Sequence, residues 1–302
     1  MGKNVEKAQW LNHAVWGKWF TQLYGAAIAA WQWDGLPDSV DRRFLEKTLF
    51  WQGRALFFRD EVIGDLALPM VDSGTIDVYG LPLRRTAIAS NGYYRPDLTR
   101  DTSVIIWNNL THTPDHIALR MYAQRLAEID RTIDVNLNAQ KTPIAITCAE
   151  NEKVSIVGAY DRMQANVPAI ISAKTVAPNI SVLKTDAPYI CDKLQTLKRQ
   201  TLQEAFQYLG IEANTNEKAE RLVSDEVTAN LGGVEAMRNV RLQARRQAAE
   251  EINRRFGLNV TVDFQSNLSL ARIMEGGMQS EPLYKDAGTD MPRSDRQAPD
   301  TV

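Results

Sequence analysis

Two long segments of the chain carry apolar residues at intervals of three and four positions, a spacing that predicts amphipathic helices. The first runs from about Pro114 to Leu137, and the second from about Tyr189 to Leu209. At about 1.5 Å of rise per residue, helices of this length span about 30–36 Å. Each apolar face is too narrow to form a core alone, so we expect the pair to bury it against further copies of the chain. The two stripes are Leu119, Tyr122, Leu126, Ile129 and Ile133, and Ile190, Leu194, Leu197, Ala205 and Leu209.

The segment between these helices predicts a compact α+β insert. Two short and unusual hinge sequences close it, Asn138–Pro143 on one side and Leu183–Pro188 on the other. Apolar, β-branched runs predict strands, and the stretch between the first two is interpreted as a helix. The expected strands are Ile144–Thr147, Ala169–Ile171 and Ser181–Leu183, with a helix from about Glu150 to Ala165.

The N-terminal part of the chain changes character near Gly53. Before it, aromatic and apolar residues from Trp10 to Trp31 recur at helical spacing and predict a helix that ends at Gly35–Pro37. A short helix from Val40 to about Phe50 follows. After Gly53, short apolar runs separated by turn residues predict a small barrel or a strongly bent sheet. The five expected strands are Ala55–Phe58, Val62–Val71, Thr75–Tyr79, Thr86–Ile88 and Val104–Trp107.

The C-terminal third is polar apart from one long helix. The stretch 211–233 is charged and is expected to have little order, and a helix is expected from about Val234 to Phe256. We expect its arginines to form a solvated or intersubunit face, since no aromatic residues interleave with them. After Gly277 the tail is rich in Asp, Ser and Pro, which predicts disorder. The arginines are Arg238, Arg241, Arg245, Arg246, Arg254 and Arg255.

Composition is that of a folded protein without obvious catalytic chemistry. Of 302 residues, 44% are hydrophobic and 24% are charged, and the net charge is −2. Cys148 and Cys191 give no disulfide framework, and we expect buried thiols in a reducing compartment. No apolar run reaches the length of a membrane span, about 18 residues, so we expect synthesis in the cytosol and no membrane contact.

Catalytic and metal-binding signatures do not stand out in the chain. It contains no phosphate-binding G-x-x-x-x-G-K loop and no dinucleotide-binding glycine fingerprint. His13, His112 and His116 do not cluster with Cys or acidic residues at metal-ligand spacing. We therefore expect no enzyme activity, no cofactor and no metal.

Several collinear stretches resemble the portal protein of small protein-primed short-tailed phages, which is also called the upper collar or head–tail connector. The matches extend from about Trp19 to Phe264, most of the chain. The most specific of them are the two hinges and the residues that follow the second one. The matching stretches are Phe44–Lys47, Asn136–Pro143, Lys184–Tyr189, Asp192–Leu194, Tyr208–Ile211, Asn216–Lys218, Glu220–Arg221, Ser224–Val227 and Ile252–Asn253 with Phe256–Val260.

This resemblance implies an α+β, mainly helical portal fold, with long stem helices, an SH3-like small barrel in the outer, or wing, region and an α+β clip. It divides the chain into consecutive parts. These are a wing with N-terminal helices and barrel (1–113), a first stem helix (114–138), the clip (139–187), a second stem helix (188–209), a channel loop (210–233), a wing helix with a C-terminal strand (234–278) and a disordered tail (279–302).

The resemblance also implies which residues carry function. Lys184 and Lys193 match lysines that line the family's DNA channel, and Lys218 matches one in its channel loop, where a second lysine is replaced here by Ala219. A ring of such lysines would contact passing phosphates without reading sequence. The other expected site residues are Glu217, Arg221, Asp225 and Glu226 in the channel loop, and Asn138, Gln140, Lys141, Pro143, Asp186 and Pro188 at the hinges and clip.

The function implied by the resemblance is that of a virion protein at the head–tail junction. It would form a ring of about twelve subunits that conducts double-stranded DNA. Expected partners are a separate packaging ATPase, the major capsid and scaffold proteins, and a lower collar or tail protein. Packaging RNA is left open, because 1–19 carries only Lys3, Lys7 and Lys18 where the family has a long basic arm. The alternative is a helical nucleic-acid-binding or adaptor protein that forms no ring.

Overall fold

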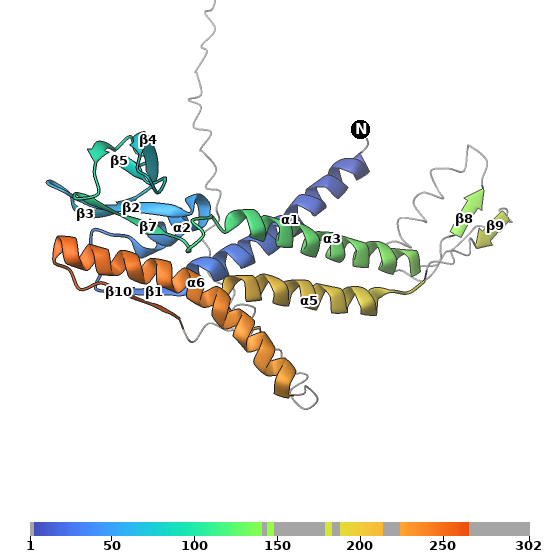
Figure 1. Cartoon of the computed structure of the whole chain (residues 1–302). Helices are drawn as coiled ribbons and strands as arrows, with labels where there is room; N and C mark the ends of the chain where they lie inside the picture. The colour runs from blue at the N-terminus through green and yellow to red at the C-terminus, as the bar shows by residue number, and fades with distance from the viewer. Residues whose placement is uncertain (1–2, 141–143, 148–178, 183–187, 214–223, 266–302) are drawn as a thin grey trace, which may run out of the picture. The chain divides into compact units, whose positions relative to one another are not determined.

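The computed structural model describes residues 3–140, 144–147, 179–182, 188–213 and 224–265 (Figure 1). The chain divides into two compact units. The helical unit consists of Met1–Phe20 and Ala118–Ala205, and the mixed unit of Thr21–Ile117 and Phe206–Val302. Each unit is thus assembled from segments that lie far apart in the sequence.

The helical unit is built on the two expected long helices. They are α3 (His116–Gln140) and α5 (Cys191–Leu209), and each begins and ends within a few residues of its predicted bounds. The first part of α1 (Lys3–Ala29) belongs to the same unit. The expected stripes largely face inward: Leu119, Leu126 and Ala205 are buried, whereas Leu197 stays 47% exposed.

Side-chain contacts show that α3 and α5 run antiparallel side by side (Figure 1). Asn136, near the end of α3, contacts the start of α5, whereas Asp130, almost two turns earlier, pairs with Lys198 further along α5. Two of the expected strands of the insert are also present. β8 (Ile144–Thr147) pairs antiparallel with β9 (Asn179–Val182), while the other expected strand and the helix lie outside the described residues.

Two antiparallel sheets in the mixed unit enclose one apolar core. The first sheet has the order β3–β2–β7 and the second β4–β5–β6. Leu56 and Phe58 of β2 pack with Met70, Ala87 and residues of the later strands. The expected mixed helix-and-strand fold is therefore confirmed, while an SH3-like barrel stays a prediction. The strands are β2 (Arg54–Asp60), β3 (Gly64–Leu68), β4 (Met70–Ile76), β5 (Pro82–Ile88), β6 (Tyr94–Leu98) and β7 (Ser103–Trp107).

The chain forms six strands here where the sequence predicted five. The expected strand Val62–Val71 is divided at Pro69, which has no N–H to donate to a ladder, into β3 and β4. The prediction missed β6, because four of its five residues are exposed and it contains Pro96, so its sequence lacks an apolar alternation. It pairs with β5 at an edge of the sheet, where proline is tolerated.

The prediction of a helix through Trp31 was wrong. Helix α1 ends at Ala29, and β1 (Trp31–Asp34) pairs antiparallel with β10 (Thr261–Phe264). Burial alternates along β1, with Trp31 and Trp33 inside and the two polar residues outside. Trp31 matched both the helical spacing of the preceding segment and this two-residue period, and pairing with a distant strand decided between them.

Two further helices complete the mixed unit. The expected short helix is α2 (Arg42–Gln52), capped by Asp41, which accepts a hydrogen bond from Phe44 N–H at 2.9 Å. Helix α6 (Ser224–Phe256) packs against β7 and β10 and begins ten residues before its predicted start at Val234.

Gly232 and Gly233, at the end of the stretch 211–233 that was expected to precede the helix, instead lie inside α6. A Cβ atom at Gly233 would approach the side chain of Gln207 to 2.7 Å, so the missing side chain leaves room for a close neighbour.

In the part of the chain that the structure describes, no helix has the length and apolarity that a membrane span requires.

Candidate functional site

A hydrogen-bonded junction at Asn136 ties the end of α3 to the start of α5. The Asn136 side-chain N–H donates to the carbonyl of Pro188 at 3.0 Å. Its side-chain oxygen accepts from Ile190 N–H at 3.2 Å and from the Cys191 thiol at 3.2 Å. One buried amide therefore satisfies three groups of the incoming chain, and it fixes where α5 begins.

A second junction lies further along the same helix pair. The Asp130 carboxylate accepts a hydrogen bond from the indole N–H of Trp19 at 2.8 Å and pairs with the Lys198 ammonium at 2.6 Å. The same ammonium lies 5.2 Å from the centre of the Trp19 ring, within the range of a cation–π contact. Because Trp19 is only 2% exposed, this carboxylate joins α1, α3 and α5 inside the helical unit.

The outer side of α3 carries a groove that α1 borders. It encloses about 900 Å³ and includes the apolar side chains of Trp16, Ala127 and Val135. Arg131 also lines the groove, and its guanidinium donates hydrogen bonds to the side chains of Asn12 and Asp134 at 2.8 Å each. Val135 is 63% exposed and Met121, on the same side of α3, is 59% exposed. This surface, the outer face of α3, thus exposes apolar side chains among polar ones, and within the described part of the chain nothing covers them.

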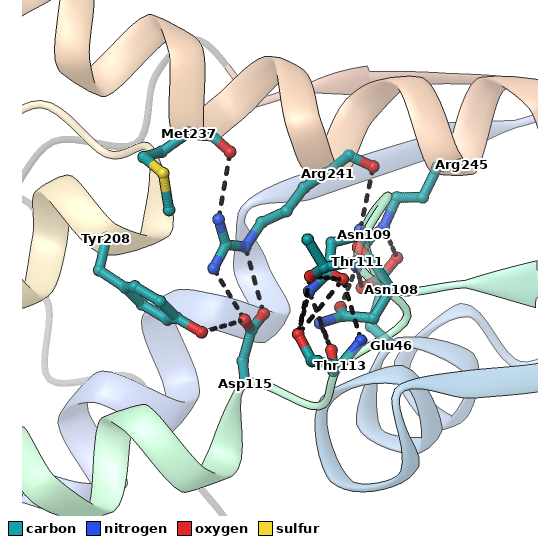
Figure 2. Close-up of polar contacts among 10 residues, drawn as sticks. All are labelled: Glu46, Asn108, Asn109, Thr111, Thr113, Asp115, Tyr208, Met237, Arg241 and Arg245. Carbon is teal, nitrogen blue, oxygen red and sulfur yellow. Dashed lines mark hydrogen bonds and ion pairs between the residues drawn. The ribbon is translucent and has the colours of Figure 1, made fainter.

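A buried polar network in the mixed unit surrounds Asp115, the residue just before α3 (Figure 2). Its carboxylate accepts from Nη2 of Arg241 at 2.8 Å, from Nε of the same guanidinium at 3.3 Å, and from the Tyr208 hydroxyl at 3.0 Å. The start of α3, the end of α5 and the middle of α6 therefore meet at one carboxylate.

Burial and charge act in opposite directions on the acidity of this network. Burial raises the pKa of Asp115. The charge and hydrogen bonds of Arg241, together with hydrogen bonds from Asn108 and Tyr208, outweigh this effect and hold the pKa below its ordinary value. Burial, followed by the charge of Asp115, raises the pKa of Tyr208 well above its ordinary value. The network therefore holds an ionised carboxylate and a neutral phenol at physiological pH.

The next turn of α6 repeats this arrangement with Glu46 of α2 (Figure 2). Arg245 donates to both carboxylate oxygens of Glu46, from Nε at 3.0 Å and from Nη2 at 2.7 Å. It also donates to the backbone oxygen and side-chain oxygen of Asn108 at 2.6 and 3.0 Å. The Trp33 indole N–H donates to Glu46 at 2.8 Å as well, so both charges are fully hydrogen-bonded.

The expectation of a solvated or intersubunit arginine face on α6 was therefore wrong for its central residues. Arg241 and Arg245 are buried and paired within the chain, and their guanidinium carbons lie 4.6 Å and 4.3 Å from the ring centres of Tyr208 and Trp31. The aromatic residues missing from α6 itself are supplied by other elements. Arg254 fits the expectation better: its side chain is 66% exposed and pairs with Glu251 in the same helix.

The structure brings together only some of the residues that the sequence singled out. Lys193 is exposed in the first turn of α5, Asn138 and Gln140 are exposed in the last turn of α3, and the Pro188 carbonyl belongs to the Asn136 junction. Asp225 and Glu226 fall in the first turn of α6. The remaining candidates lie outside the described residues: Lys141, Pro143, Lys184, Asp186, Glu217, Lys218 and Arg221.

The histidines that were considered as metal ligands contact aromatic rings. His112 stacks on Trp107 with ring centres 3.7 Å apart, and His116 lies 5.1 Å from Trp51. Burial lowers the pKa of His112. Within the described ranges, no group of three His, Cys, Asp or Glu side chains is placed to hold a metal ion.

Sequence reasoning missed Asn136, Glu46 and Asp115 as structural centres. Glu46 had a usable signal, because it lies among Leu45, Leu49 and Phe50 on the apolar side of a short helix. An acidic residue at such a position requires a partner. Nothing local identifies that partner, which lies 199 positions away in the chain.

Comparisons with known proteins all point to phage connector or portal proteins. The sequence profile described as "Phage Connector (GP10)" matches residues 2–269. Among solved structures, the portal and tail of native bacteriophage P68 contains a chain with 13% identity and a TM-score of 0.49, over 92% of this chain and 96% of that one. An HK97 family phage portal protein from Corynebacterium diphtheriae gives 10% identity and a TM-score of 0.40, over 82% and 91%. The virion of a native gene transfer agent particle gives 12% and 0.43, over 87% and 86%. With its family profile matched over nearly its whole length, this chain belongs to the phage connector family.

Proposed function

We propose that the protein is the portal subunit of a phage head, assembling into a ring of about twelve copies at one capsid vertex. The observation that carries this proposal is the uncovered outer face of α3, with Met121 and Val135 each more than half exposed beside an open groove. Exposed apolar surface of this kind marks a contact with another molecule. Membership of the connector family supports a second copy of the chain as that molecule.

The proposed subunit contact is heterologous, so that the outer face of α3 meets a different surface of the neighbouring copy. Contacts of this type close into rings when the rotation between copies is right. Leu197 on α5, which is 47% exposed, offers an apolar side chain on the other helix of the pair. Charged residues at the groove, such as Glu128 and Arg131, would then pair at its rim.

We propose that double-stranded DNA passes through the ring during packaging and ejection. Lys193 is exposed at the start of α5, and each copy would place one such lysine at the same height. Lys184 and Lys218 are proposed to contribute similar rings. A chain with a net charge of −2 would hold DNA weakly, because each phosphate contact releases counterions and adds affinity that retards sliding.

The remaining roles follow from the same proposal. The ring would nucleate the shell with scaffold and major capsid protein, dock a separate packaging ATPase, and later join the lower collar or tail protein. It would itself be a structural protein without enzymatic activity, located at the head–tail junction of the virion after synthesis in the host cytoplasm. The region 139–187 would form the clip and the two-sheet region the wing. The expected channel loop, 210–233, would be shorter than predicted, because 224–233 belong to α6.

Negative-stain electron microscopy of the purified protein, with its mass determined in parallel, tests the proposal. We expect toroids with a central hole wide enough for duplex DNA, and a mass that gives the subunit number. A stable monomer or dimer at high protein concentration would contradict the ring. It would favour the alternative, a helical nucleic-acid-binding or adaptor protein.

A further inference from the structure

Arg85 is a buried arginine whose hydrogen bonding is incomplete. It lies on β5 and is 6% exposed. Its Nη1 donates to the backbone oxygen of Ser103 at 3.0 Å and to the hydroxyl of the same residue at 3.3 Å. Its Nε is buried and has no hydrogen-bond partner among the described residues. A guanidinium remains charged at any accessible pH, so this charge and this donor require a partner.

The carboxylates near Arg85 are already engaged elsewhere. Asp72 is its partner in the strand register, but the Asp72 carboxylate pairs with Arg54 at 2.8 Å. Asp77 contributes a favourable charge from further away, and its Oδ1 accepts from the backbone N–H groups of Tyr79 and Leu81 at 2.8 Å each. Arg85 thus differs from Arg241 and Arg245, which are each neutralised by a buried carboxylate.

Two further arginines increase the positive charge at this place. Arg255, at the end of α6, also donates to the Ser103 backbone oxygen, at 3.5 Å. Burial, followed by the charges of Arg255 and Arg100, lowers the pKa of Arg85. Arg255 pairs with Glu251 at 3.0 Å, but Glu251 also neutralises Arg254. The group therefore keeps an excess of positive charge.

The chemistry of the missing partner follows from these donors. An oxyanion with several oxygens accepts hydrogen bonds from more than one guanidinium at once, and it neutralises them together. Arg85 pairs with Leu98 in the strand register, which places Arg100 two residues beyond its strand partner. Arg100 is exposed and the Arg255 side chain is 16% exposed, so both guanidinium groups can meet an ion that comes from solvent.

We propose that Arg85, Arg100 and Arg255 form an oxyanion site that takes a phosphate group. The phosphate comes either from free inorganic phosphate or from the backbone of a nucleic acid, since both present the same non-bridging oxygens. The site belongs to the mixed unit and involves none of the proposed channel lysines. It is independent of whether the chain forms a ring.

Titration calorimetry of the full chain with inorganic phosphate, at an ionic strength held constant with chloride, tests the site. We expect saturable binding that Arg100→Gln weakens at least about tenfold, because one of the charge-assisted contacts is lost. Arg84→Gln is the matched control. Arg84 is the adjacent arginine on β5, its side chain is 66% exposed, and it pairs with Asp97 instead. Phosphate binding should be unchanged in that variant.

Arg85→Met provides a second variant with its own readout. It should lose the increase in Tm that phosphate gives the wild type. Its Tm without phosphate should equal or exceed that of the wild type, because an uncompensated buried charge has been replaced by an apolar chain. Reduced stability in chloride alone would mean that Arg85 is already compensated, and it would overturn the proposal.

Fluorescence anisotropy with a labelled DNA duplex distinguishes the two sources. Weaker duplex binding by Arg100→Gln than by Arg84→Gln assigns the site to a nucleic-acid phosphate. Equal duplex binding by the two variants, together with Arg100-dependent binding of inorganic phosphate, assigns it to the free ion. No saturable phosphate binding, or binding that Arg100→Gln leaves intact, would refute the site.

Discussion

Arg245 and Glu46 place two full charges out of contact with water, with side chains that are 1% and 2% exposed. Such a pair is weak evidence of net stabilisation, because removing two ions from water offsets much of their attraction. Its larger effect is on specificity. A guanidinium that needs both carboxylate oxygens and Asn108 fits only one placement of α6 against α2.

Removing one member of this pair should be costly. Arg245→Met leaves Glu46 buried without its counterion, and we expect the free energy of unfolding to fall by about 3–5 kcal/mol. Arg254→Gln removes an exposed arginine of the same helix and should change stability by less than about 1 kcal/mol. Urea unfolding of both variants measures the difference. Similar losses in the two would show that burial of the Arg245 pair has no special effect.

The Asp115 network predicts a pH dependence of stability. The pKa of Asp115 is lowered in the folded protein, so its ion pair contributes fully above the ordinary carboxyl pKa, about 4. This contribution is lost as pH falls through the folded-state value. We therefore expect the free energy of unfolding to decrease below about pH 4 more steeply in the wild type than in Asp115→Asn. Asp134→Asn, at a half-exposed carboxylate, should keep the wild-type slope in the same titration.

Lys193 gives a residue-scale test of DNA conduction. Lys193→Ala should leave rings intact but alter DNA packaging or retention, and it should reduce the salt dependence of DNA binding, because one phosphate contact per subunit is lost. Lys47→Ala removes another exposed lysine, on α2, as a control. Wild-type packaging, retention and salt slope in Lys193→Ala would remove this residue from the proposed channel.

At the scale of elements, the junctions between helices depend on close approach as much as on charge. Gly210 ends α5 with φ +73°, and a Cβ atom there would lie 2.7 Å from the backbone of Arg238 on α6. Arg238 in turn donates from Nε to the carbonyl of Gly210 at 3.0 Å. The end of one helix and the side of the other therefore meet backbone to backbone.

Gly210→Ala should disrupt this contact. Gly80 has nearly the same φ, +75°, but an added Cβ atom would meet no other group within 4 Å. We expect Gly80→Ala to lower the free energy of unfolding by about 1–2 kcal/mol, the cost of the left-handed conformation alone. Gly210→Ala should cost distinctly more, because backbone must move as well. Thermal or urea unfolding measures both, and equal losses would mean that α6 shifts freely.

Helix periodicity made α3 and α5 predictable from sequence, because their stripes recur over many turns. β1 was not predictable, since Trp31 continued a helical spacing and its partner strand lies more than 200 residues away. Asn136 lay inside a stretch that matched the family, Asn136–Pro143, yet only the structure shows which of its atoms bond to Pro188 and Ile190. Contacts between residues far apart in the chain could not be predicted from this single sequence.

At the scale of the whole molecule, the uncovered outer face of α3 governs assembly in our proposal. Met121 and Val135 lie on the same side of the helix, and both exceed half exposure. A monomer would keep both of these apolar side chains in water, whereas a subunit contact would bury them. Assembly is therefore expected to begin at this face and to depend on protein concentration.

The double variant Met121→Glu, Val135→Glu should yield folded subunits that do not assemble. Two buried, unpaired carboxylates per contact would oppose association strongly, while the positions are exposed in the single chain. Val62→Glu changes an apolar residue that is 92% exposed in the turn after β2 and should leave assembly unchanged. Size-exclusion chromatography with light scattering measures the mass, and circular dichroism verifies folding. Intact rings from the double variant would exclude this face as the interface.

Because β1 pairs with β10, this part of the subunit can complete its folding only after β10 has been synthesised. Trp31–Asp34 emerge early, but their partner strand, Thr261–Phe264, is made more than 200 residues later. Until that strand has left the exit tunnel, two tryptophans and a row of open backbone groups stay without their native cover. A nascent chain is thus exposed to wrong associations between the emergence of β1 and that of β10, and a subunit becomes competent for assembly only after β10 has emerged.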